Sequence, residues 1–265
     1  MQVVEAGFWR HPAQSAVSYP EDGADRCRVI EDWSYWFQHR NACIAAAVRR
    51  FPPAGPVWDI GGGNGVVAKA LADAGFPAVV VEPGPSGIRN ARQRGLPVVQ
   101  AAWSEDLVRP GSLEAAGLFD VIEHLEDDRA FLRSVRNALK PGGLLYLTVP
   151  AHPFLWSDED RAAGHFRRYT VQALQDALAA GGFRVLYLTG FFACLRLPIW
   201  LLRSLPDRLA LGRVSGKAYQ QEHRLPRGPL GALISGALGR EVARIRAGRS
   251  RSSGASLLAV AARHD

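Results

Sequence analysis

The sequence predicts an α/β fold in which helices cover both faces of a doubly wound, mostly parallel sheet. Apolar runs suited to buried strands alternate with helical patterns from Val57 onward. Residues 57–71 predict a strand, a glycine turn and a helix in direct succession, and residues 78–82 predict the next strand. Such a strand, turn and helix N-terminus together make a cradle the size of a nucleotide, because free backbone amides point at the ligand.

The glycine turn contains Gly61, Gly63 and Gly65, and it follows Asp59 at the end of the first strand. Glycines allow the backbone to approach a ligand closely. The second strand ends in Glu82, and a carboxylate at this tip can accept hydrogen bonds from both hydroxyls of a ribose. The plainer alternative is a solvated glutamate at a strand end.

The same turn also allows a dinucleotide ligand. A dehydrogenase motif, Gly-x-Gly-x-x-Gly, places its third glycine where Val66 stands, or where Ala68 stands if it is read from Gly63. An NAD(P)-dependent oxidoreductase would also need a donor such as Tyr-x-x-x-Lys after the fifth strand, and the sequence has none there. A non-catalytic binding module is a third alternative, and the intact Asp59 and Glu82 argue against it.

From Asp59 to Gly65 the sequence resembles motif I of the class I S-adenosylmethionine-dependent methyltransferases, and Glu82 matches their ribose-binding acid. The resemblance extends from about Pro56 to Gly190 and includes the last strand. It implies S-adenosyl-L-methionine as the cofactor. It also implies a Rossmann-like sheet of order 3-2-1-4-5-7-6 whose last strand is antiparallel.

The resemblance assigns further cofactor contacts. In this family the turn after the third strand, here 97–101, often supplies an acid to the adenine amine. Ala102 and Trp103 occupy this turn, so the acid is absent or displaced and Trp103 is expected to cover the adenine ring instead. Pro83 and Asp120 are expected to line the rest of the cofactor site.

The chain is basic, with a formal net charge of +7 and a pI near 9.8. This charge favours anionic partners such as nucleic acid, anionic lipid or a phosphorylated substrate, although a solvated arginine-rich surface explains it equally well. Aromatic residues are not interleaved with the basic residues late in the chain, which disfavours nucleic acid.

The cysteines and the N-terminus bear on the compartment. Three cysteines without a Cys-x-x-Cys pair indicate neither a disulfide framework nor a thiolate zinc site, so we expect a reducing, cytoplasmic compartment. The N-terminus lacks the continuous apolar core of a signal peptide. No stretch approaches the roughly 20 apolar residues that cross a bilayer.

We expect one α/β domain with two additions. Residues 1–54 are expected to form a helical extension or lid, and residues 55–190 with 256–265 the methyltransferase core. Residues 191–255 are expected to form an apolar and basic helical insert.

Aromatic and apolar residues recur at helical spacing in the N-terminal extension. The resulting helix either packs on the sheet edge or covers the active site. Trp36 and Phe37 are expected in the core, and Arg40 and Asn41 on the same helix are candidates to face the cofactor or substrate.

The second half of the domain continues the alternation. Residues 113–119 and 144–149 predict the fourth and fifth strands, residues 183–189 the sixth, and residues 256–262 the last. Thr170 is placed to cap a helix that precedes the sixth strand. In open α/β sheets ligands bind at the carboxyl ends of the strands, so residues that follow these strands are the candidates for chemistry.

Asp120, Glu123 and His124 follow the fourth strand, and His165 lies in a polar loop after the fifth. Methyl transfer is an in-line displacement at a sulfonium, and a hydroxyl acceptor must also lose its proton. In one mechanism His165 or His124 is the general base, because an imidazole titrates near neutral pH. In another, all four residues bind Mg²⁺ or another divalent cation that lowers the pKa of the acceptor hydroxyl.

The metal alternative rests on a further resemblance. Asp120 to His124 resembles the Glu-x-x-Glu-His signature of small-RNA 2′-O-methyltransferases and of ubiquinone-pathway O-methyltransferases, with Asp in place of the first Glu. Residues 165–170 approximately match their distal element. The alternative without metal is that Glu123 and His124 cap the following helix and line the cofactor pocket.

Residues of the polar loop are candidates for acceptor binding. They are His152, Trp156, Arg168 and Tyr169, with Asp160 as an outer candidate. The pattern around them resembles bacterial small-molecule or glycan-associated methyltransferases. We therefore expect O-methylation of a small-molecule, glycan or lipid-linked hydroxyl, with an amine or carbon acceptor less favoured and nucleic acid disfavoured.

The segment 191–206 is apolar and carries two arginines, Arg196 and Arg203. It is too short to span a bilayer, but basic residues and a tryptophan are typical of an interfacial segment. A peripheral membrane contact is one interpretation, and a pocket wall or a dimer face is the other. The sequence does not determine the oligomeric state.

Overall fold

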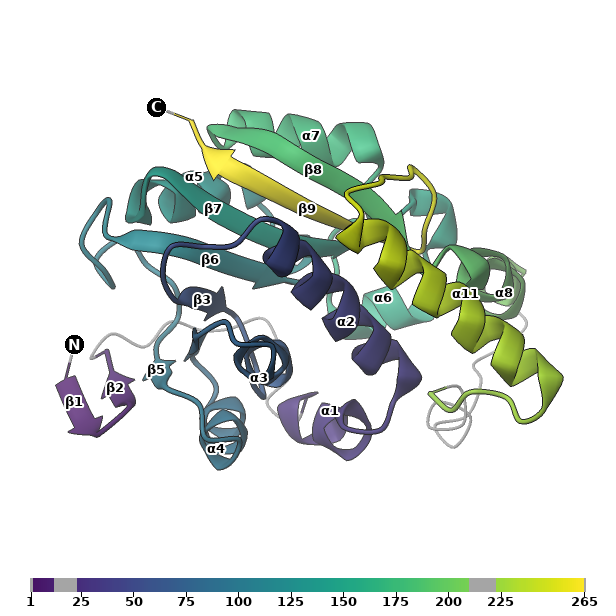
Figure 1. Cartoon of the computed structure of the whole chain (residues 1–265), viewed down its shortest axis with the longest axis horizontal. Helices are drawn as coiled ribbons and strands as arrows, with labels where there is room; N and C mark the ends of the chain where they lie inside the picture. The colour runs from purple at the N-terminus through teal and green to yellow at the C-terminus, as the bar shows by residue number, and fades with distance from the viewer. Residues whose placement is uncertain (1, 12–22, 210–222, 265) are drawn as a thin grey trace.

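The computed structural model describes residues 2–11, 23–209 and 223–264. Its centre is one sheet in the order β1-β2-β5-β4-β3-β6-β7-β9-β8 (Figure 1). The seven strands from β5 to β8 have the predicted 3-2-1-4-5-7-6 order, and β9 is antiparallel to both of its neighbours. The sequence-based prediction of the fold is therefore confirmed.

The predicted core strands all form, and β7 and β8 are longer than expected. In chain order the strands are β1 (Gln2–Glu5), β2 (Phe8–Arg10), β3 (Val57–Ile60), β4 (Ala78–Glu82), β5 (Val98–Gln100), β6 (Leu113–Phe119), β7 (Leu139–Pro150), β8 (Phe183–Phe191) and β9 (Ser256–Arg263).

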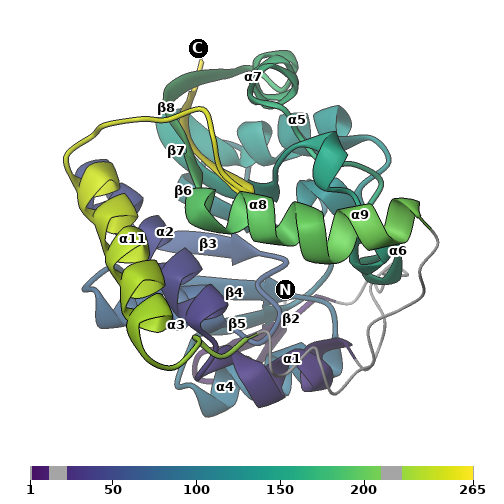
Figure 2. The same cartoon turned by 90° about the vertical axis from the view of Figure 1, so that its right-hand side faces the viewer.

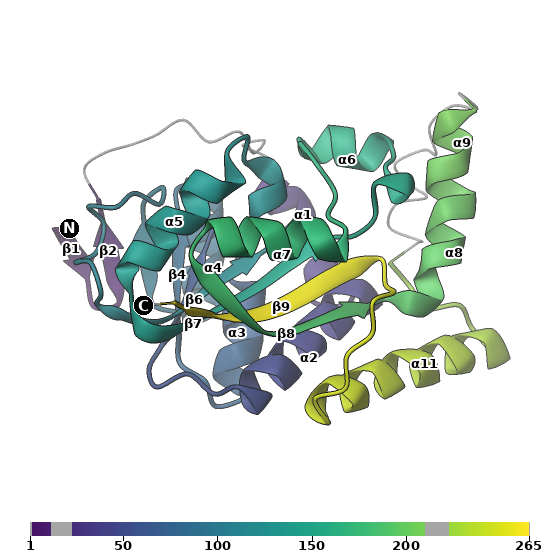
Figure 3. The same cartoon turned by 90° about the horizontal axis from the view of Figure 1, so that it is seen from above.

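Helices cover both faces of the sheet, and each face has its own hydrophobic core (Figure 3). Helices α2, α3 and α11 contribute to one core, and α5 and α7 to the other. The α-helices are α1 (Gly23–Glu31), α2 (Tyr35–Arg50), α3 (Val66–Asp73), α4 (Pro85–Gln93), α5 (Asp128–Ala138), α6 (Asp158–Ala163), α7 (Val171–Ala180), α8 (Arg196–Ile199), α9 (Leu205–Arg208) and α11 (Pro229–Arg246).

Short helical turns follow several strands and position the loops of the sheet edge. They are the 3₁₀ turns η1 (Ile122–His124), η2 (Pro153–Leu155) and η3 (Ala193–Leu195), and the π-helical turn η4 (Trp200–Ser204) that joins α8 to α9. Thr170 caps α7 by accepting a hydrogen bond from the Ala173 backbone amide, as predicted. A capping box between Ser157 and Asp160 fixes the start of α6.

The N-terminal extension is not wholly helical as expected, because it begins with the β1–β2 hairpin. The hairpin turns at Gly7, whose φ is 76°, and β2 extends the sheet by pairing with β5. Phe8 is buried and lies under the guanidinium groups of Arg10 and Arg92. Strand β2 has only 3 residues and lies between turns, so its sequence carries too little periodicity to predict a strand.

Helix α11 from the late insert lies beside α2 from the N-terminal extension (Figures 1 and 2). A buried polar contact joins them, since His39 Nε2 lies at hydrogen-bond distance, 3.0 Å, from Glu241 Oε2. The Glu241 carboxylate also accepts hydrogen bonds from the backbone amides of Phe192 and Ala193, both of 2.8 Å. These contacts fix α2, which carries functional side chains at the sheet edge, against η3.

Candidate active site

The glycine turn folds into the predicted cradle between β3 and α3. Gly61, Gly63 and Gly65 all have positive φ, at 72°, 51° and 72°. A Cβ on Gly65 would lie 2.6 Å from the Leu96 side chain, so this glycine is required for packing. A Cβ on Gly63 would meet nothing within 4 Å, which leaves the space above this peptide open for a ligand.

Glu82 reaches the cradle from the tip of β4. Its Oε2 accepts a hydrogen bond of 3.1 Å from the Gly63 amide, and its Oε1 one of 2.7 Å from the Gly84 amide. Burial raises the pKa of Glu82, and these two amides partly offset the effect. The carboxylate is thereby fixed beside Gly63, where the predicted ribose contact requires it, and the half-buried Pro83 follows directly.

Asp59 lies beneath the glycine turn and is almost fully buried. The Ala68 backbone forms a hydrogen bond with it, and Oδ2 has no partner among the described residues. Burial raises the pKa of Asp59 to about 7, against the opposing charge of Arg40. A buried carboxylate oxygen without a partner is costly unless a ligand completes its hydrogen bonds, which fits a cofactor at this place.

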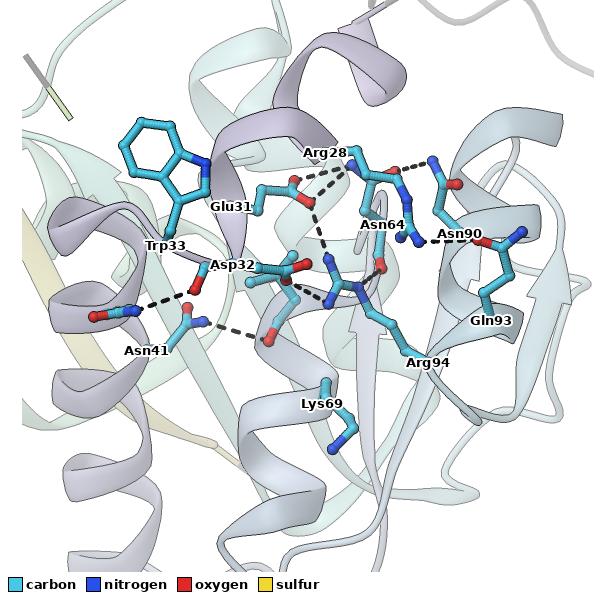
Figure 4. A network of polar contacts seen from close by, with 12 residues as sticks. Arg28, Glu31, Asp32, Trp33, Asn41, Asn64, Lys69, Asn90, Gln93 and Arg94 are labelled. Carbon is cyan, nitrogen blue, oxygen red and sulfur yellow. Dashed lines mark hydrogen bonds and ion pairs between the residues drawn. The ribbon is translucent and has the colours of Figure 1, made fainter. Parts of the chain in front are cut away.

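A polar network that the sequence did not predict supports the glycine turn on the side facing α1 and α4 (Figure 4). Asn64 is buried and donates through Nδ2 to both carboxylate oxygens of Glu31, each at 3.0 Å. Its Oδ1 accepts a 2.9 Å bond from Asn90, and its carbonyl accepts a 3.0 Å bond from Arg94. The network ties α1 and α4 to the cofactor turn. In the sequence, the one indication of this network is Asn64 between Gly63 and Gly65.

Asp120 stands at the tip of β6 but does not join the predicted metal ligands. Its Oδ2 lies 2.5 Å from Arg40 Nη1 on α2, and its Oδ1 accepts a 2.9 Å bond from Thr148. Both oxygens therefore already have partners in this arrangement, and the role of Asp120 as a metal ligand stays a prediction. The prediction that Arg40 faces the site agrees with this ion pair.

Glu123, His124 and His165 converge, as the sequence predicts. One ligand atom from each lies within 4.8 Å of the others. The rings of His124 and His165 meet edge to face with centroids 4.7 Å apart. The Phe166 amide donates a 2.7 Å bond to the Glu123 carbonyl, which draws the polar loop across to the tip of β6.

Burial sets the charge of this cluster. Glu123 is fully buried, and neither carboxylate oxygen has a hydrogen-bond partner in the described parts of the chain. Burial, with the nearby Asp120, raises the pKa of Glu123 well above its usual range. Burial, with the nearby His165, lowers the pKa of His124 to about 4. Near pH 7 the His124 imidazole is therefore neutral and its ring can act as an acceptor or a ligand.

Asp160 organises the polar loop. Its Oδ1 lies 2.8 Å from His165 Nδ1 and accepts a 2.8 Å bond from Arg168 Nε, while Oδ2 accepts a 2.9 Å bond from the Ser157 amide. Burial alone would raise the pKa of Asp160, but the bond from His165 and the charge of Arg168 outweigh it and lower the pKa. The sequence suggested Asp160 only as an outer substrate contact, and its role as the partner of His165 was missed.

The other predicted substrate residues separate into different environments. His152 stacks on Phe154 with centroids 5.3 Å apart, and its buried Nε2 has no hydrogen-bond partner within the described ranges. Trp156 is half-buried in the same loop. Tyr169, in contrast, is in the core and donates a 2.6 Å bond to Asp128. The prediction of Tyr169 as a substrate contact is therefore corrected: its hydroxyl anchors the loop to α5.

Trp103, predicted to cover the adenine ring, and its neighbour Ala102 in the predicted cofactor site lie after β5, on the side of the core that α5 covers. Trp103 is half-buried, and its Nε1 donates a 3.0 Å bond to Ser134 on α5. Ala102 is likewise half-buried. This bond holds the indole in place, and its contact with adenine stays a prediction.

Backbone strain concentrates at this sheet edge. Three non-glycine residues of the described chain have positive φ, namely Asp120, His152 and Phe192. They follow β6, β7 and β8, with Ala151 between β7 and His152. Strained non-glycine residues persist where the surrounding structure fixes them, and they cluster at functional sites.

The family described as a methyltransferase domain matches residues 31–188, more than half of the chain. The chain belongs to the class I S-adenosylmethionine-dependent methyltransferases. The cradle fits S-adenosyl-L-methionine. The Glu82 carboxylate lies beside Gly63, where it can accept hydrogen bonds from a ribose, and Gly63 leaves room for a ligand above its peptide. This membership decides against the oxidoreductase alternative.

Curated relatives match a limited part of the methyltransferase. The ubiquinone biosynthesis O-methyltransferase of Xanthomonas campestris pv. campestris (strain B100) is 33% identical over 110 residues, which are 39% of this chain and 46% of that protein. The protein of the same name from Xanthomonas oryzae pv. oryzae (strain PXO99A) is 32% identical over 100 residues, 35% of this chain and 42% of that protein. The chain thus spans less than half the length of these relatives.

Solved structures share the fold at low identity. A putative methyltransferase from Haloferax volcanii, in complex with the Trm112 activator, is 18% identical with a TM-score of 0.59, covering 94% of this chain and 100% of that one. Phosphoethanolamine N-methyltransferase 2 of Haemonchus contortus, solved with S-adenosyl-L-methionine, is 17% identical with a TM-score of 0.57, covering 94% of this chain and 58% of that one.

We predict that Gly63→Val weakens S-adenosyl-L-methionine binding by about a hundredfold, because the new side chain fills the open cradle. Calorimetric titration with the cofactor measures this. Gly75→Val is the matched control, since Gly75 also has positive φ and an open Cβ position but lies beyond α3 at the other edge of the sheet. Equal affinities for the two variants would contradict the assigned cradle.

A second prediction concerns Asp59 and pH. The pKa of Asp59 is about 7 in the folded methyltransferase, against 3.8 for an ordinary aspartate. Its contribution to stability is therefore complete below pH 3.8 and is lost as pH rises through about 7. Asp59→Asn cannot titrate, so its free energy of unfolding relative to wild type should be higher near pH 8 than near pH 5.

Urea unfolding of the cofactor-free protein at the two pH values measures this difference. Asp176→Asn is the control, because Asp176 is exposed on α7. A relative stability of Asp59→Asn that stays constant or falls with pH would refute the titration assigned to Asp59.

Proposed function

We propose that the chain O-methylates a hydroxyl acceptor and that His165 accepts the hydroxyl proton. The Asp160–His165 pair carries the proposal. With Nδ1 bonded to Asp160 at 2.8 Å, Nε2 is the nitrogen available to a substrate. The acceptor oxygen attacks the methyl carbon of S-adenosyl-L-methionine, the carbon–sulfur bond breaks, and S-adenosylhomocysteine leaves while the proton goes to Nε2.

Several observations support a hydroxyl rather than an amine or carbon acceptor. The curated relatives are named O-methyltransferases, and this chain matches less than half of their length. Asp160 also stabilises the imidazolium that forms when His165 takes the proton, as a buried carboxylate beside a histidine does in hydrolases. Arg168 on the same carboxylate fixes the geometry.

A divalent cation at Glu123, His124 and His165 is a second candidate, favoured by the convergence of these residues within 4.8 Å. Two imidazoles and one carboxylate suit a first-row divalent cation. The Glu123 carboxylate, which lacks a hydrogen-bond partner among the residues that the structure describes, and the neutral imidazole of His124 fit that donor set. A bound cation would supply Lewis-acid activation of the acceptor hydroxyl.

The test uses a panel of phenols, catechols and sugar derivatives incubated with the protein and S-adenosyl-L-methionine. S-Adenosylhomocysteine release and the methylated product are measured by mass spectrometry. We expect His165→Asn to lower turnover roughly 10²- to 10⁴-fold, the range for loss of a general base, with cofactor affinity unchanged. His264→Asn, beyond β9 at the opposite edge, is the control. Full turnover of His165→Asn would exclude His165 as the base.

The cation is tested without any acceptor, by calorimetric titration of Mn²⁺ and Zn²⁺ into the protein. If the cluster binds metal, Glu123→Gln and His124→Asn each weaken binding at least tenfold, and a chelator abolishes turnover until metal is restored. Unchanged metal binding in both variants, or full turnover in the presence of a chelator, would exclude the cation. His165 would then act as the base without a metal.

A further inference from the structure

The helix formed by α8, η4 and α9, here called helix 196–208, lies on the outside of the molecule (Figure 2), and its leucines are exposed. Leu197, Leu201 and Leu202 are 62%, 45% and 66% exposed, and Leu209 just after the helix is 58% exposed. Together these four residues are the leucine stripe. Their exposure places all four on the solvent side of the helix.

The inward side of helix 196–208 packs Ile199 and Trp200 against the core and also carries polar contacts. Ser204 is fully buried, Arg203 pairs with Glu159, and Asp207 pairs with Arg161. A surface helix of a globular protein normally turns its leucines inward, whereas these four face solvent. The ion pairs of Arg203 and Asp207 attach the other side of the helix to α6.

Helix 196–208 is attached to the loop that carries the proposed catalytic groups. Arg208 donates a 3.1 Å bond to the Phe154 carbonyl, and the Arg196 guanidinium lies 5.9 Å from the centre of the Phe154 ring. Glu159 and Arg161, which pair with the helix, flank Asp160 in sequence. The leucine stripe is therefore the outer surface of the structure that positions His165.

We propose that the leucine stripe is a docking surface for an anionic membrane, with its leucines at the boundary between headgroups and acyl chains. Charge complementarity selects this occupant. The chain carries +7, and Arg196 and Arg208 stand at the two ends of the stripe, so an anionic bilayer attracts it whereas a second copy repels it. No helix in the described ranges is long and apolar enough to cross a bilayer, so the contact is peripheral.

This surface also narrows the acceptor class, a step that rests on the proposed function. Contact through the leucine stripe brings the loop of Asp160 and His165 to the bilayer surface. An acceptor hydroxyl on a molecule with an apolar tail can reach that loop without leaving the membrane. The acceptor is therefore an amphiphile held in the bilayer.

The experiment is co-sedimentation of the full chain with vesicles of phosphatidylcholine, with and without phosphatidylglycerol. We expect wild type to bind the anionic vesicles and bind weakly to phosphatidylcholine alone. Leu201→Ser/Leu202→Ser should reduce binding about tenfold or more, because two exposed leucines are lost from the contact. Val4→Ser is the control and should bind like wild type, since Val4 is 49% exposed on β1 at the far end of the molecule (Figures 1 and 3).

Equal vesicle binding by wild type and the double serine variant, or no vesicle binding by wild type, would overturn the proposal. If wild type is a dimer in solution and the double serine variant is a monomer, the stripe binds a second copy of the chain instead. Cofactor affinity of each variant shows whether it has folded. Vesicle binding needs neither cofactor nor acceptor, so its failure is separate from a failure of the proposed methyl transfer.

Discussion

The site depends on the burial of several carboxylates at one edge of the sheet. The positive charge of the Arg40 guanidinium partly compensates for this burial. Burial raises the pKa of Glu31, Asp59 and Glu123, and the charge of Arg40 opposes the rise at each of them. Arg40 also pairs directly with Asp120. Buried charges of one sign are costly without an opposite charge. Helix α2 is therefore an integral part of the site as well as a cover for the sheet.

The arrangement divides the site into two halves with different chemistry. On one side, Asp59, Glu82 and the glycine turn form a cradle whose polar groups fit an adenosine, and Asn64 holds this turn from outside. On the other side, Asp160 orients His165 opposite Glu123. The 2.7 Å bond from the Phe166 amide to the Glu123 carbonyl holds the polar loop against the tip of β6. The cofactor cradle and the Asp160–His165 pair are thus supported by separate contacts.

The late insert extends this platform outward. Glu241 on α11 holds η3 and α2 together through buried hydrogen bonds, and helix 196–208 begins directly after η3. Ion pairs from that helix to Glu159 and Arg161 then brace α6 beside Asp160. Contacts that determine where His165 points are therefore continuous with the surface that exposes the leucine stripe.

The sequence by itself determined the cradle and the meeting of Glu123, His124 and His165, because strand tips in a doubly wound fold converge and short motifs fix local backbone geometry. The sheet order followed from the resemblance to the methyltransferase family. The sequence could not assign partners to Asp120, Tyr169 or Asp160, because each partner is distant in sequence or one of several nearby polar groups. Only the tertiary structure gave Asp120 to Arg40, buried Tyr169 against Asp128 and joined Asp160 to His165. It also decided which side of helix 196–208 faces water, since the ion pairs that fix this side form only after the elements pack.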